Sequence, residues 1–512
     1  MINLSELLLG IDIGSYSSKG VLCNVDGSVI AEARVPHEIS FPKPGYAEHD
    51  AEKVWWHDFS FIAGELTNKI PKGDRIVSVG ISGVGPCILP VNASGEPLRQ
   101  AILYGIDNRS ARQIEYLEKV YSKEALLKFS GTRLTSQSAG PKILWIKENE
   151  PEIYDRAHKF VTSTTYIIHK LTGRYAMDMH TASYFNPLFD FSSMGWNARF
   201  AGEIVEISRL PELGWSNEIA GVITKSAAME TGLPEGVPVT FGAVDGLAEA
   251  TSVGVIHPGD LMIMYGSTAG FYLPLKKPQP TEEFWLLAGA IKDQVAFGGG
   301  LATSGAATTW FRNQFGRDLL DAETENGTNS YACLALEAAS SPPGANGLLM
   351  LPYLSGERTP IFDPKARGMF AGLSLSHTRG VMYRALLEGT AFAIRMNIEA
   401  MQKTGADLDQ IIAVGGGTLN DLWLQIVSDV CGMSQIVPKQ TIGACYGDAF
   451  LAGLAVGAIK GIDRLKQVWV KEGKEIKPDD SKKQEYNQYF QLFVDLYLNS
   501  KETLHKLADL QK

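Results

Sequence analysis

The sequence lacks the features that mark several large classes of protein. No Cys-x-x-Cys pair occurs among its five cysteines, which are Cys23, Cys87, Cys333, Cys431 and Cys445. An odd number of widely spaced cysteines argues against a disulfide framework and against a zinc knuckle. No apolar run approaches the roughly 18 residues that span a bilayer, and no basic leader precedes Leu7–Leu9. We therefore expect a cytoplasmic protein that has no membrane partner.

The chain also lacks an excess of positive charge. Its 47 Lys and Arg residues and 57 Asp and Glu residues give a formal net charge of −10. This balance offers no electrostatic footprint for nucleic acid or for an anionic membrane. The sequence contains no Gly-x-x-x-x-Gly-Lys-Ser/Thr P-loop, no Gly-x-Ser-x-Gly elbow and no His-x-x-x-His pair. Nucleic-acid binding, a Ser or Cys nucleophile and a protein-bound transition metal are therefore not expected.

Hydrophobic residues and glycines, in contrast, are abundant. Hydrophobic residues make up 45% of the 512 residues, and many of the 52 glycines stand at the ends of apolar runs. At roughly 100–200 residues per domain, this length suits two large lobes or a few domains. Three apolar runs within the first 35 residues predict a strand meander, because Asp26-Gly27 is typical of a hairpin turn.

Further along the chain, the pattern of strand, small hydroxyl-rich turn and strand recurs at residues 260–273. This repeat suggests two related lobes that meet near residues 246–258. A third apolar run, 410–414, leads into glycines and then into an expected helix at 420–431. Other helices are expected at 51–70, 110–129, 140–149 and 160–171, and other buried strands at 76–83 and 238–246. The predicted domains are an N-terminal lobe 1–246, a C-terminal lobe 247–460 and a helical tail 461–512.

The turn of the first hairpin carries residues suited to a phosphate group. Gly14 lets backbone N–H groups approach phosphate oxygens, and Ser15, Ser17 and Lys19 add side-chain donors. Asp12, at the end of the preceding strand, could hold Mg²⁺ directly or through water. An ordinary tight hairpin is the alternative, and this motif alone would favour that alternative.

The second hairpin repeats this arrangement at Gly266-Ser267-Thr268. The two hairpin tips are separated in the sequence by the length of one lobe. This pairing favours two tips that clamp a polyphosphate over two ordinary turns. Asp245 follows an apolar run and stands between glycines, so it could accept a hydroxyl proton as a general base. It could equally cap the helix that follows, and the residues alone leave both readings open.

Two other motifs allow weaker interpretations. Gly415–Gly417 with Asn420 suits a flat ring that slides against the backbone, but it departs from the dinucleotide fingerprint Gly-x-Gly-x-x-Gly because Asn stands at position 420. Tyr104 and Asp107 could bind a polyol, although the neighbouring Arg109 makes a structural ion pair the more common outcome.

Taken together, these residues resemble the FGGY carbohydrate kinase family, nearest to its xylulokinase-like members. The matching blocks extend from about residue 7 to residue 457, and they are Leu9–Ser15, Gly45–Asp50 with Trp55-Trp56, Tyr353–Pro360, Leu387–Phe392 and Gly415–Gly417.

The resemblance implies an α/β fold of two ribonuclease-H-like lobes, of the actin/hexokinase type, around a central cleft that takes ATP and sugar. It implies that Asp245 is the catalytic base and that Asp12 and Asp245 lie near Mg²⁺, directly or through water. The ATP-binding residues that it implies are Gly14, Ser15, Ser17, Lys19, Gly266, Ser267, Thr268, Gly305, Thr309, Gly416, Gly417 and Asn420. The expected substrate contacts are Gly85, Tyr104, Asp107, Asp178 and Asp245. Homodimers are common in this family.

The departures from the family pattern fall on the sugar side. Xylulokinases that resemble this chain carry Gln-Met-His-Gly where Val84–Cys87 stand here, so the sugar-contacting His is missing. Thr181 replaces a common Asp or Asn, the segment from Tyr104 to Arg109 has one extra residue, and Tyr16 replaces a small residue. We therefore expect an ATP- and Mg²⁺-dependent kinase for a ketose, such as a pentulose, or for a polyol, without assuming D-xylulose. The alternative is a catalytically weak regulatory protein of the same fold that binds sugar and ATP.

Overall fold

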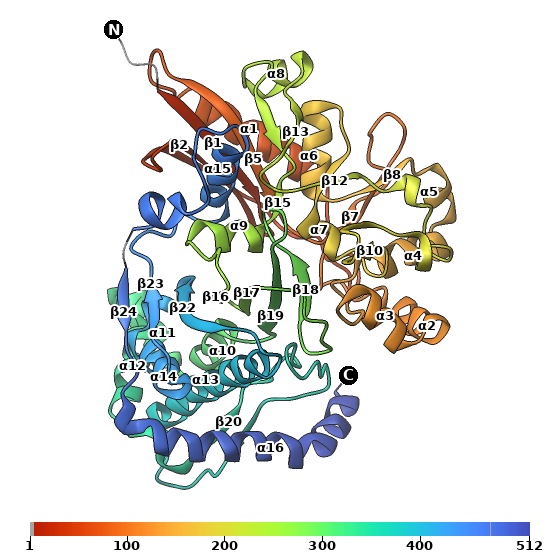
Figure 1. Ribbon diagram of the computed structural model, residues 1–512. Helices are drawn as coiled ribbons and strands as arrows, with labels where there is room; N and C mark the ends of the chain where they lie inside the picture. The colour runs from red at the N-terminus through yellow and green to blue at the C-terminus, as the bar shows by residue number, and fades with distance from the viewer. Residues whose placement is uncertain (1–4, 472, 512) are drawn as a thin grey trace. The chain divides into compact units, whose positions relative to one another are not determined.

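The computed structural model describes residues 5–471 and 473–511. The chain forms two compact units, each assembled from separate stretches of sequence (Figure 1). Among the described residues, the first unit contains 5–256, 274–296 and 442–471, and the second contains 257–273, 297–441 and 473–511. The predicted domain boundaries, 1–246, 247–460 and 461–512, stay predictions.

A central sheet of mixed direction organises the first unit. Its strand order is β13-β14-β5-β1-β2-β3, and β15 also pairs with β5. The strands β1, β2 and β3 form the expected antiparallel meander, while β5 runs parallel to β1. The bounds are β1 Glu6–Ile13, β2 Ser17–Asn24, β3 Val29–Pro36, β5 Arg75–Gly83, β13 Ile219–Val222, β14 Pro238–Thr240 and β15 Ala243–Val244.

Helices cover both faces of this sheet, which is why β1 is apolar along nearly its whole length. Leu7, Leu9 and Ile11 pack in one cluster with α1 (His57–Thr67). Leu8 points the other way and packs with α15 (Ala444–Ala455). In Figure 1, α15 (blue) therefore lies against strands from the other end of the chain (red).

The close approach of α15 depends on a glycine in β1. A β-carbon added at Gly10 would lie 1.8 Å from the carbonyl oxygen of Cys445, a backbone atom that cannot move aside alone. We expect Gly10→Ala to lower the free energy of unfolding by about 1–3 kcal/mol, measured by urea or thermal unfolding. Gly202→Ala, where a β-carbon meets nothing within 4 Å, is the matched control. A wild-type unfolding midpoint in Gly10→Ala would contradict the packing described.

Shorter elements complete the first unit. Its further strands are β4 Glu48–His49, β6 Leu89–Val91, β7 Ala101–Ile102, β8 Lys159–Val161, β9 Ala176–Asp178, β10 Phe189–Asp190, β11 Gly195–Trp196, β12 Glu212–Gly214 and β18 Trp285–Ala288. Its further helices are α2 Ala111–Tyr121, α3 Lys123–Ser130, α4 Ala139–Asn149, α5 Pro151–Arg156, α6 Ser163–Thr172, α7 Met179–Ser183, α8 Lys225–Thr231 and α9 Asp245–Ser252.

The second unit repeats the arrangement of hairpin and parallel strand. Its sheet has the order β19-β17-β16-β22-β23-β24, in which β16 and β17 are antiparallel and β22 is parallel to β16. The predicted hairpin at 260–273 and the strand at 410–414 are thus confirmed. The strands are β16 Gly259–Tyr265, β17 Ala269–Leu275, β19 Val295–Leu301, β20 Leu349–Leu351, β21 Met369–Ala371, β22 Leu408–Val414, β23 Gln435–Val437 and β24 Lys474–Ile476.

The α-helices described in the second unit are α10 Gly305–Phe315, α11 Arg317–Asn326, α12 Ser330–Ala339, α13 Arg379–Lys403, α14 Asp421–Cys431 and α16 Lys483–Leu510, and α14 matches the helix predicted at 420–431. The range predicted as a helical tail, 461–512, contains the strand β24 as well as α16. The long helix α13 is buried along most of its length and contacts α12, α14 and β20.

Three expected helices differ in detail from the structure. The helix expected at 110–129 is two helices, because Ser122 has a φ of 59° and its hydroxyl accepts from the backbone N–H of Ala125 to begin α3. The segment 51–70 starts with a π-helix at Ala51–Trp56 before α1. The first two positions of the helix expected at 160–171 belong to the strand β8, and α6 begins at Ser163.

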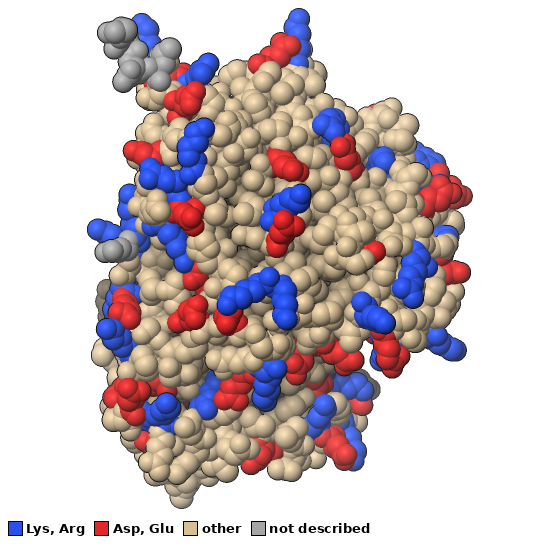
Figure 2. Space-filling view, in the orientation of Figure 1, with Lys and Arg blue, Asp and Glu red and all other residues tan. Residues whose placement is uncertain are grey.

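Charged side chains of both signs are interspersed over the face drawn in Figure 2. Within the described part of the chain, no helix is both long and apolar enough to cross a membrane.

Candidate functional site

Three neighbouring strands of the first unit end at one edge of the sheet, and each brings a polar side chain there. In the register of the sheet, Asp12 of β1 pairs with Ser82 of β5, and Ser82 pairs with Ala243 of β15. Asp245 follows β15 directly. Because the carboxyl ends of parallel strands share an edge, this arrangement brings Asp12 and Asp245 together.

A buried serine links two carboxyl groups at this edge. The Ser82 hydroxyl lies 3.0 Å from Asp12 Oδ1 and 2.7 Å from Asp448 Oδ2. One hydroxyl donates one proton, so the second of these hydrogen bonds requires a protonated carboxyl group. Burial raises the pKa of Asp12 to about 6 and raises the pKa of Asp448 well above its ordinary value. Ser82 and Asp448 were not predicted, although Asp448 is the one acidic residue in the sequence of α15.

Asp245 lies among further acidic groups. Burial, followed by the neighbouring charges of Asp12 and Glu249, raises the pKa of Asp245 to about 8. The side chain keeps part of its surface open to solvent, and its Oδ1 accepts from the N–H of Gly246 at 2.7 Å. Val244, rather than Asp245, occupies the N-cap position of α9. Asp245 is therefore not the N-cap residue of α9, and its role as a base stays a prediction.

The same edge has the chemistry that a magnesium ion prefers. Burial, and next the charge of Asp12, raises the pKa of Glu249 to about 7. Mg²⁺ in phosphate-transferring sites takes one or two carboxylates together with substrate phosphates and water. The carboxylates of Asp12 and Asp245 fit that donor set. Among the described residues, no group of three or more His, Cys, Asp or Glu side chains forms a metal cage.

The tip of the first hairpin lies beside these carboxylates. Lys19 of β2 pairs with Asp12 in the register of the sheet. Its positive charge offsets part of the increase that burial causes in the pKa of Asp12. The Ser15 hydroxyl donates to the Tyr104 hydroxyl at 3.2 Å, which connects the tip to a predicted substrate residue. Tyr16 projects from the tip and is 61% exposed.

Asp107 lies in a buried ion-pair cluster. Its Oδ2 accepts from the N–H of Ala47 at 2.7 Å and from Arg109 Nη2 at 2.7 Å. Arg109 also reaches Glu48 at 2.8 Å and stacks over the ring of Tyr46 at 4.0 Å. This is the structural ion pair that the sequence allowed, so a contact between Asp107 and substrate stays a prediction.

Asp178 is likewise occupied within the protein. It caps α7, because its Oδ1 accepts from Thr181 N at 2.8 Å and its Oδ2 from the Thr181 hydroxyl at 2.5 Å. Burial raises its pKa to about 7. The departure from the family pattern at Thr181 therefore supplies a partner for Asp178 itself.

The segment that differs most from the family pattern is tightly packed. Gly85 and Pro86 are joined by a cis peptide bond. The Cys87 sulfur accepts from the N–H of Ser163 at 3.2 Å, and burial raises the pKa of this thiol to about 11. Cys87 therefore behaves as a neutral packing group.

The second unit contains a cavity of about 740 Å³, which is lined by its hairpin tip and by residues of α10, α12, α13 and α14. Seven of the residues predicted to bind ATP line this cavity: Gly266, Ser267, Gly305, Thr309, Gly416, Gly417 and Asn420. The other lining residues belong to no motif that would have predicted them, and they include Tyr265, Asn329, Tyr331, Leu336, Tyr383, Leu419 and Trp423. Apolar and aromatic walls with a few polar groups are typical of small-molecule and cofactor sites.

Backbone contacts fix the hairpin tip against α10. The N–H of Gly305 donates to the carbonyl of Gly266 at 2.8 Å, and the N–H groups of Ser304 and Ala306 donate to that of Ser267. A β-carbon at Gly305 would lie 2.7 Å from the Gly266 oxygen, so this docking requires glycine. Thr268 does not line the cavity, and its carbonyl accepts from the N–H of Gly266 at 3.0 Å.

Two predicted side chains shape the cavity wall. The Thr309 hydroxyl lies 2.8 Å from the Tyr331 hydroxyl, and the Arg312 guanidinium stacks 4.4 Å from the ring of Tyr331. The side-chain oxygen of Asn420 accepts from the N–H of Trp423 at 3.1 Å and caps α14. Asn420 thus holds the helix whose first turn borders the cavity.

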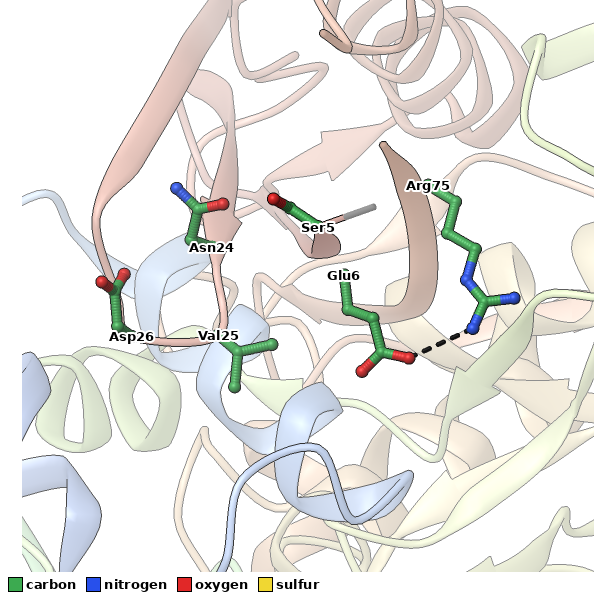
Figure 3. Close-up of a pocket in the computed structure, with 6 residues that line it drawn as sticks. All are labelled: Ser5, Glu6, Asn24, Val25, Asp26 and Arg75. Atoms are coloured by element: carbon green, nitrogen blue, oxygen red, sulfur yellow. Dashed lines mark hydrogen bonds and ion pairs between the residues drawn. The ribbon is translucent and has the colours of Figure 1, made fainter. Parts of the chain in front are cut away.

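A second hollow, of about 670 Å³, opens in the first unit at the start of β1. In Figure 3, Arg75 reaches toward Glu6, and the two side chains form an exposed ion pair of 3.1 Å. A strand rises about 3.3 Å per residue, so this end of β1 is roughly 20 Å from Asp12. No residue predicted for the site lines this hollow.

Comparisons with known proteins agree with this geometry. Residues 7–252 match the N-terminal domain, and residues 261–456 the C-terminal domain, of the FGGY family of carbohydrate kinases. A xylulose kinase of Staphylococcus epidermidis is 30% identical over 512 residues, and a gluconokinase of Bacillus subtilis is 27% identical over 514, each alignment covering 99% of both chains. The crystal structure of xylulose kinase from Rhodospirillum rubrum superposes with a TM-score of 0.90 at 29% identity, covering 98% of this chain and 100% of that one.

The two family domains account for most of the chain, and the fold is the mixed α/β fold of the actin/hexokinase type that the resemblance implied. The chain therefore belongs to the FGGY family of carbohydrate kinases, which are sugar phosphotransferases.

Proposed function

We propose that this kinase transfers the γ-phosphoryl group of ATP to a hydroxyl of a small ketose, such as a pentulose, or of a polyol, with Asp245 as general base. The observation that carries the proposal is the group of carboxyls at the ends of β1, β5 and β15, where Asp245 stands beside Asp12. The cavity of the second unit, with its seven expected residues, supports binding of the nucleotide there.

In the proposed reaction, the oxygen of the substrate hydroxyl attacks the γ-phosphorus while ionised Asp245 accepts the proton of that hydroxyl. The bond from phosphorus to the bridging oxygen of ADP breaks. Phosphoryl transfer depends mainly on positioning and on neutralisation of charge, so one base and several donors suffice. Mg²⁺, when bound, supplies charge neutralisation on the phosphates. Asp12 and Asp245 would hold it, and the tip residues Ser15, Ser17 and Lys19 would contact phosphate oxygens.

The substrate of this kinase is expected to differ from D-xylulose. Val84–Cys87 replace the segment that supplies a sugar-contacting His in similar xylulokinases, and Cys87 packs as a neutral thiol. We expect kcat/KM for D-xylulose to lie at least roughly tenfold below that for the best substrate, because one lost hydrogen bond to a buried hydroxyl is worth about that factor.

The test is ADP release with MgATP across ketopentoses, ketohexoses, aldonates such as gluconate, tetritols and pentitols. One strongly preferred acceptor supports the kinase proposal and identifies the substrate. If D-xylulose is turned over as well as the best acceptor, the substrate expectation is wrong.

The alternative function is a catalytically weak regulatory protein that binds sugar and ATP. It predicts measurable binding of ATP with negligible ADP release for every acceptor in the same panel. The crowded carboxyl groups around Asp245 favour the enzyme, since a binding protein has no need of a base with a raised pKa.

A further inference from the structure

The tip of the first hairpin, residues 14–18, is held in place by hydrogen bonds to the imidazole of His37 and the carboxylate of Asp58. His37 follows β3, and Asp58 lies in the first turn of α1. His37 Nδ1 lies 2.8 Å from Asp58 Oδ2, and His37 Nε2 lies 3.0 Å from the carbonyl oxygen of Gly14. The side chains of His37 and Asp58 are 7% and 3% exposed, so both are shielded from water.

Both ring nitrogens of His37 face groups that accept hydrogen bonds. A carbonyl oxygen cannot donate. Although burial acts to raise it, hydrogen bonds from His37, His57 and Ser18 hold the pKa of Asp58 below its ordinary value, so this carboxyl group is ionised. Because the Gly14 carbonyl oxygen can only accept, His37 Nε2 donates to it, while Nδ1 faces Asp58, so the ring bridges this carboxylate and the tip.

The same carboxylate also fixes the far end of the tip. The Ser18 hydroxyl donates to Asp58 Oδ2 at 2.8 Å. The backbone N–H of His37 donates to the carbonyl oxygen of Tyr16 at 3.0 Å. The tip is thus held at Gly14, at Tyr16 and at Ser18, and His37 or Asp58 makes each of these contacts.

The anchoring of Gly14 determines the direction of the next amide. In a planar trans peptide, the C=O and the following N–H point in opposite directions. Because the Gly14 oxygen points to His37, the N–H of Ser15 points away from His37. The Ser15 hydroxyl is engaged with Tyr104, which leaves the backbone N–H as the donor that Ser15 can offer an anion.

We propose that His37 and Asp58 are a positioning pair, which orients the Ser15 amide toward a phosphate group of the nucleotide. This inference rests on the proposed function, because it requires a phosphate at this tip. Neither residue is catalytic, since each acts through Gly14, Tyr16 or Ser18.

Two substitutions of His37 separate its two hydrogen bonds. The amide nitrogen of Asn takes the place of Nδ1, whereas that of the longer Gln reaches the place of Nε2. We expect His37→Asn to raise the dissociation constant for MgATP by about tenfold, because it loses the hydrogen bond that fixes the Gly14 carbonyl group. His37→Gln keeps a donor for Gly14 and should stay within about threefold of wild type. The acceptor KM should change in neither variant.

The readouts are MgATP binding by calorimetry, the KM of the best acceptor and the unfolding midpoint. Loss of ATP affinity in His37→Asn with recovery in His37→Gln supports the pair. Wild-type ATP affinity in His37→Asn, or equal losses of ATP affinity, acceptor affinity and stability in both variants, would overturn it.

Asp58→Asn provides an independent variant should His37→Asn not fold. It removes the charge that orients the imidazole, so weaker MgATP binding is expected, and unchanged binding would overturn the inference. A wild-type protein that binds no MgATP would overturn the proposed function and this inference together. Wild-type binding of MgATP that is insensitive to these variants would overturn the inference alone.

Discussion

Asp245→Asn is expected to lower kcat by about 10²–10⁴-fold, the usual loss when a general base is removed. Asn has nearly the same shape, but it cannot accept the proton of the attacking hydroxyl. The side chain lies at the end of β15 in the first unit, whereas the nucleotide cavity is built by residues of the second unit. The affinity for ATP in the absence of Mg²⁺ should therefore stay near that of the wild type. Steady-state kinetics with the best acceptor, together with calorimetric titration of Mg²⁺-free ATP, measure both quantities.

Asp155→Asn is the matched control, because Asp155 is an exposed carboxylate in α5 and lies outside the proposed site. It should keep the wild-type kcat. If Asp245→Asn turned over the acceptor at the wild-type rate, another group would have to be the base.

The second large effect is on the pH dependence of turnover. Burial, together with the charges of Asp12 and Glu249, raises the pKa of Asp245 to about 8. A base must be ionised to accept a proton. The value of kcat/KM for MgATP should therefore rise tenfold per pH unit below pH 8 and level off above it. At pH 6, two units lower, kcat/KM should be about 100-fold below its plateau.

The profile of kcat provides a second test of the same group. A bound cation stabilises the ionised carboxylate, so MgATP should shift the midpoint of the kcat profile to a lower pH than that of the kcat/KM profile. Asp155→Asn should reproduce both wild-type profiles, whereas Asp245→Asn should lose the rising limb. A kcat/KM that is flat from pH 6 to pH 9 in the wild type would contradict the assignment of Asp245.

Local patterns were sufficient to predict the elements that carry the two hairpin tips proposed to bind phosphate. The Asp26-Gly27 turn and the apolar runs around it predicted β1, β2 and β3, and the repeat at 260–273 predicted β16 and β17. Each of these hairpins is formed by residues close together in the sequence, so turn chemistry and apolar alternation determine it.

Residues that come together over long distances could not be predicted in this way. Ser82 links Asp12 and Asp448 only because α15 returns to the sheet from more than 360 positions along the chain. His37 and Asp58 also come from two different elements, and they meet only because the end of β3 faces the start of α1. The sequence spacing of Ser82 and Asp448, or of His37 and Asp58, does not reveal either contact.

Polar residues that serve the fold were also hard to distinguish from those that serve a ligand. Asp107 and Asp178 are buried acids near the predicted substrate segment, yet the oxygens of each bond to neighbouring protein groups. The residues that line the cavity of the second unit were hard to predict for the opposite reason. Tyr331 and Leu336 come from α12, a mostly apolar helix that contains no recognisable motif.

The most direct test of the central claim is phosphorus-31 NMR of the purified protein with MgATP and the best acceptor from the panel. The proposed function predicts a new phosphate monoester of the acceptor that forms in a one-to-one ratio with ADP and only when the acceptor is present. Inorganic phosphate in place of the monoester would identify an ATPase, and an unchanged ATP spectrum would favour the regulatory protein. Either of these results would contradict the proposal.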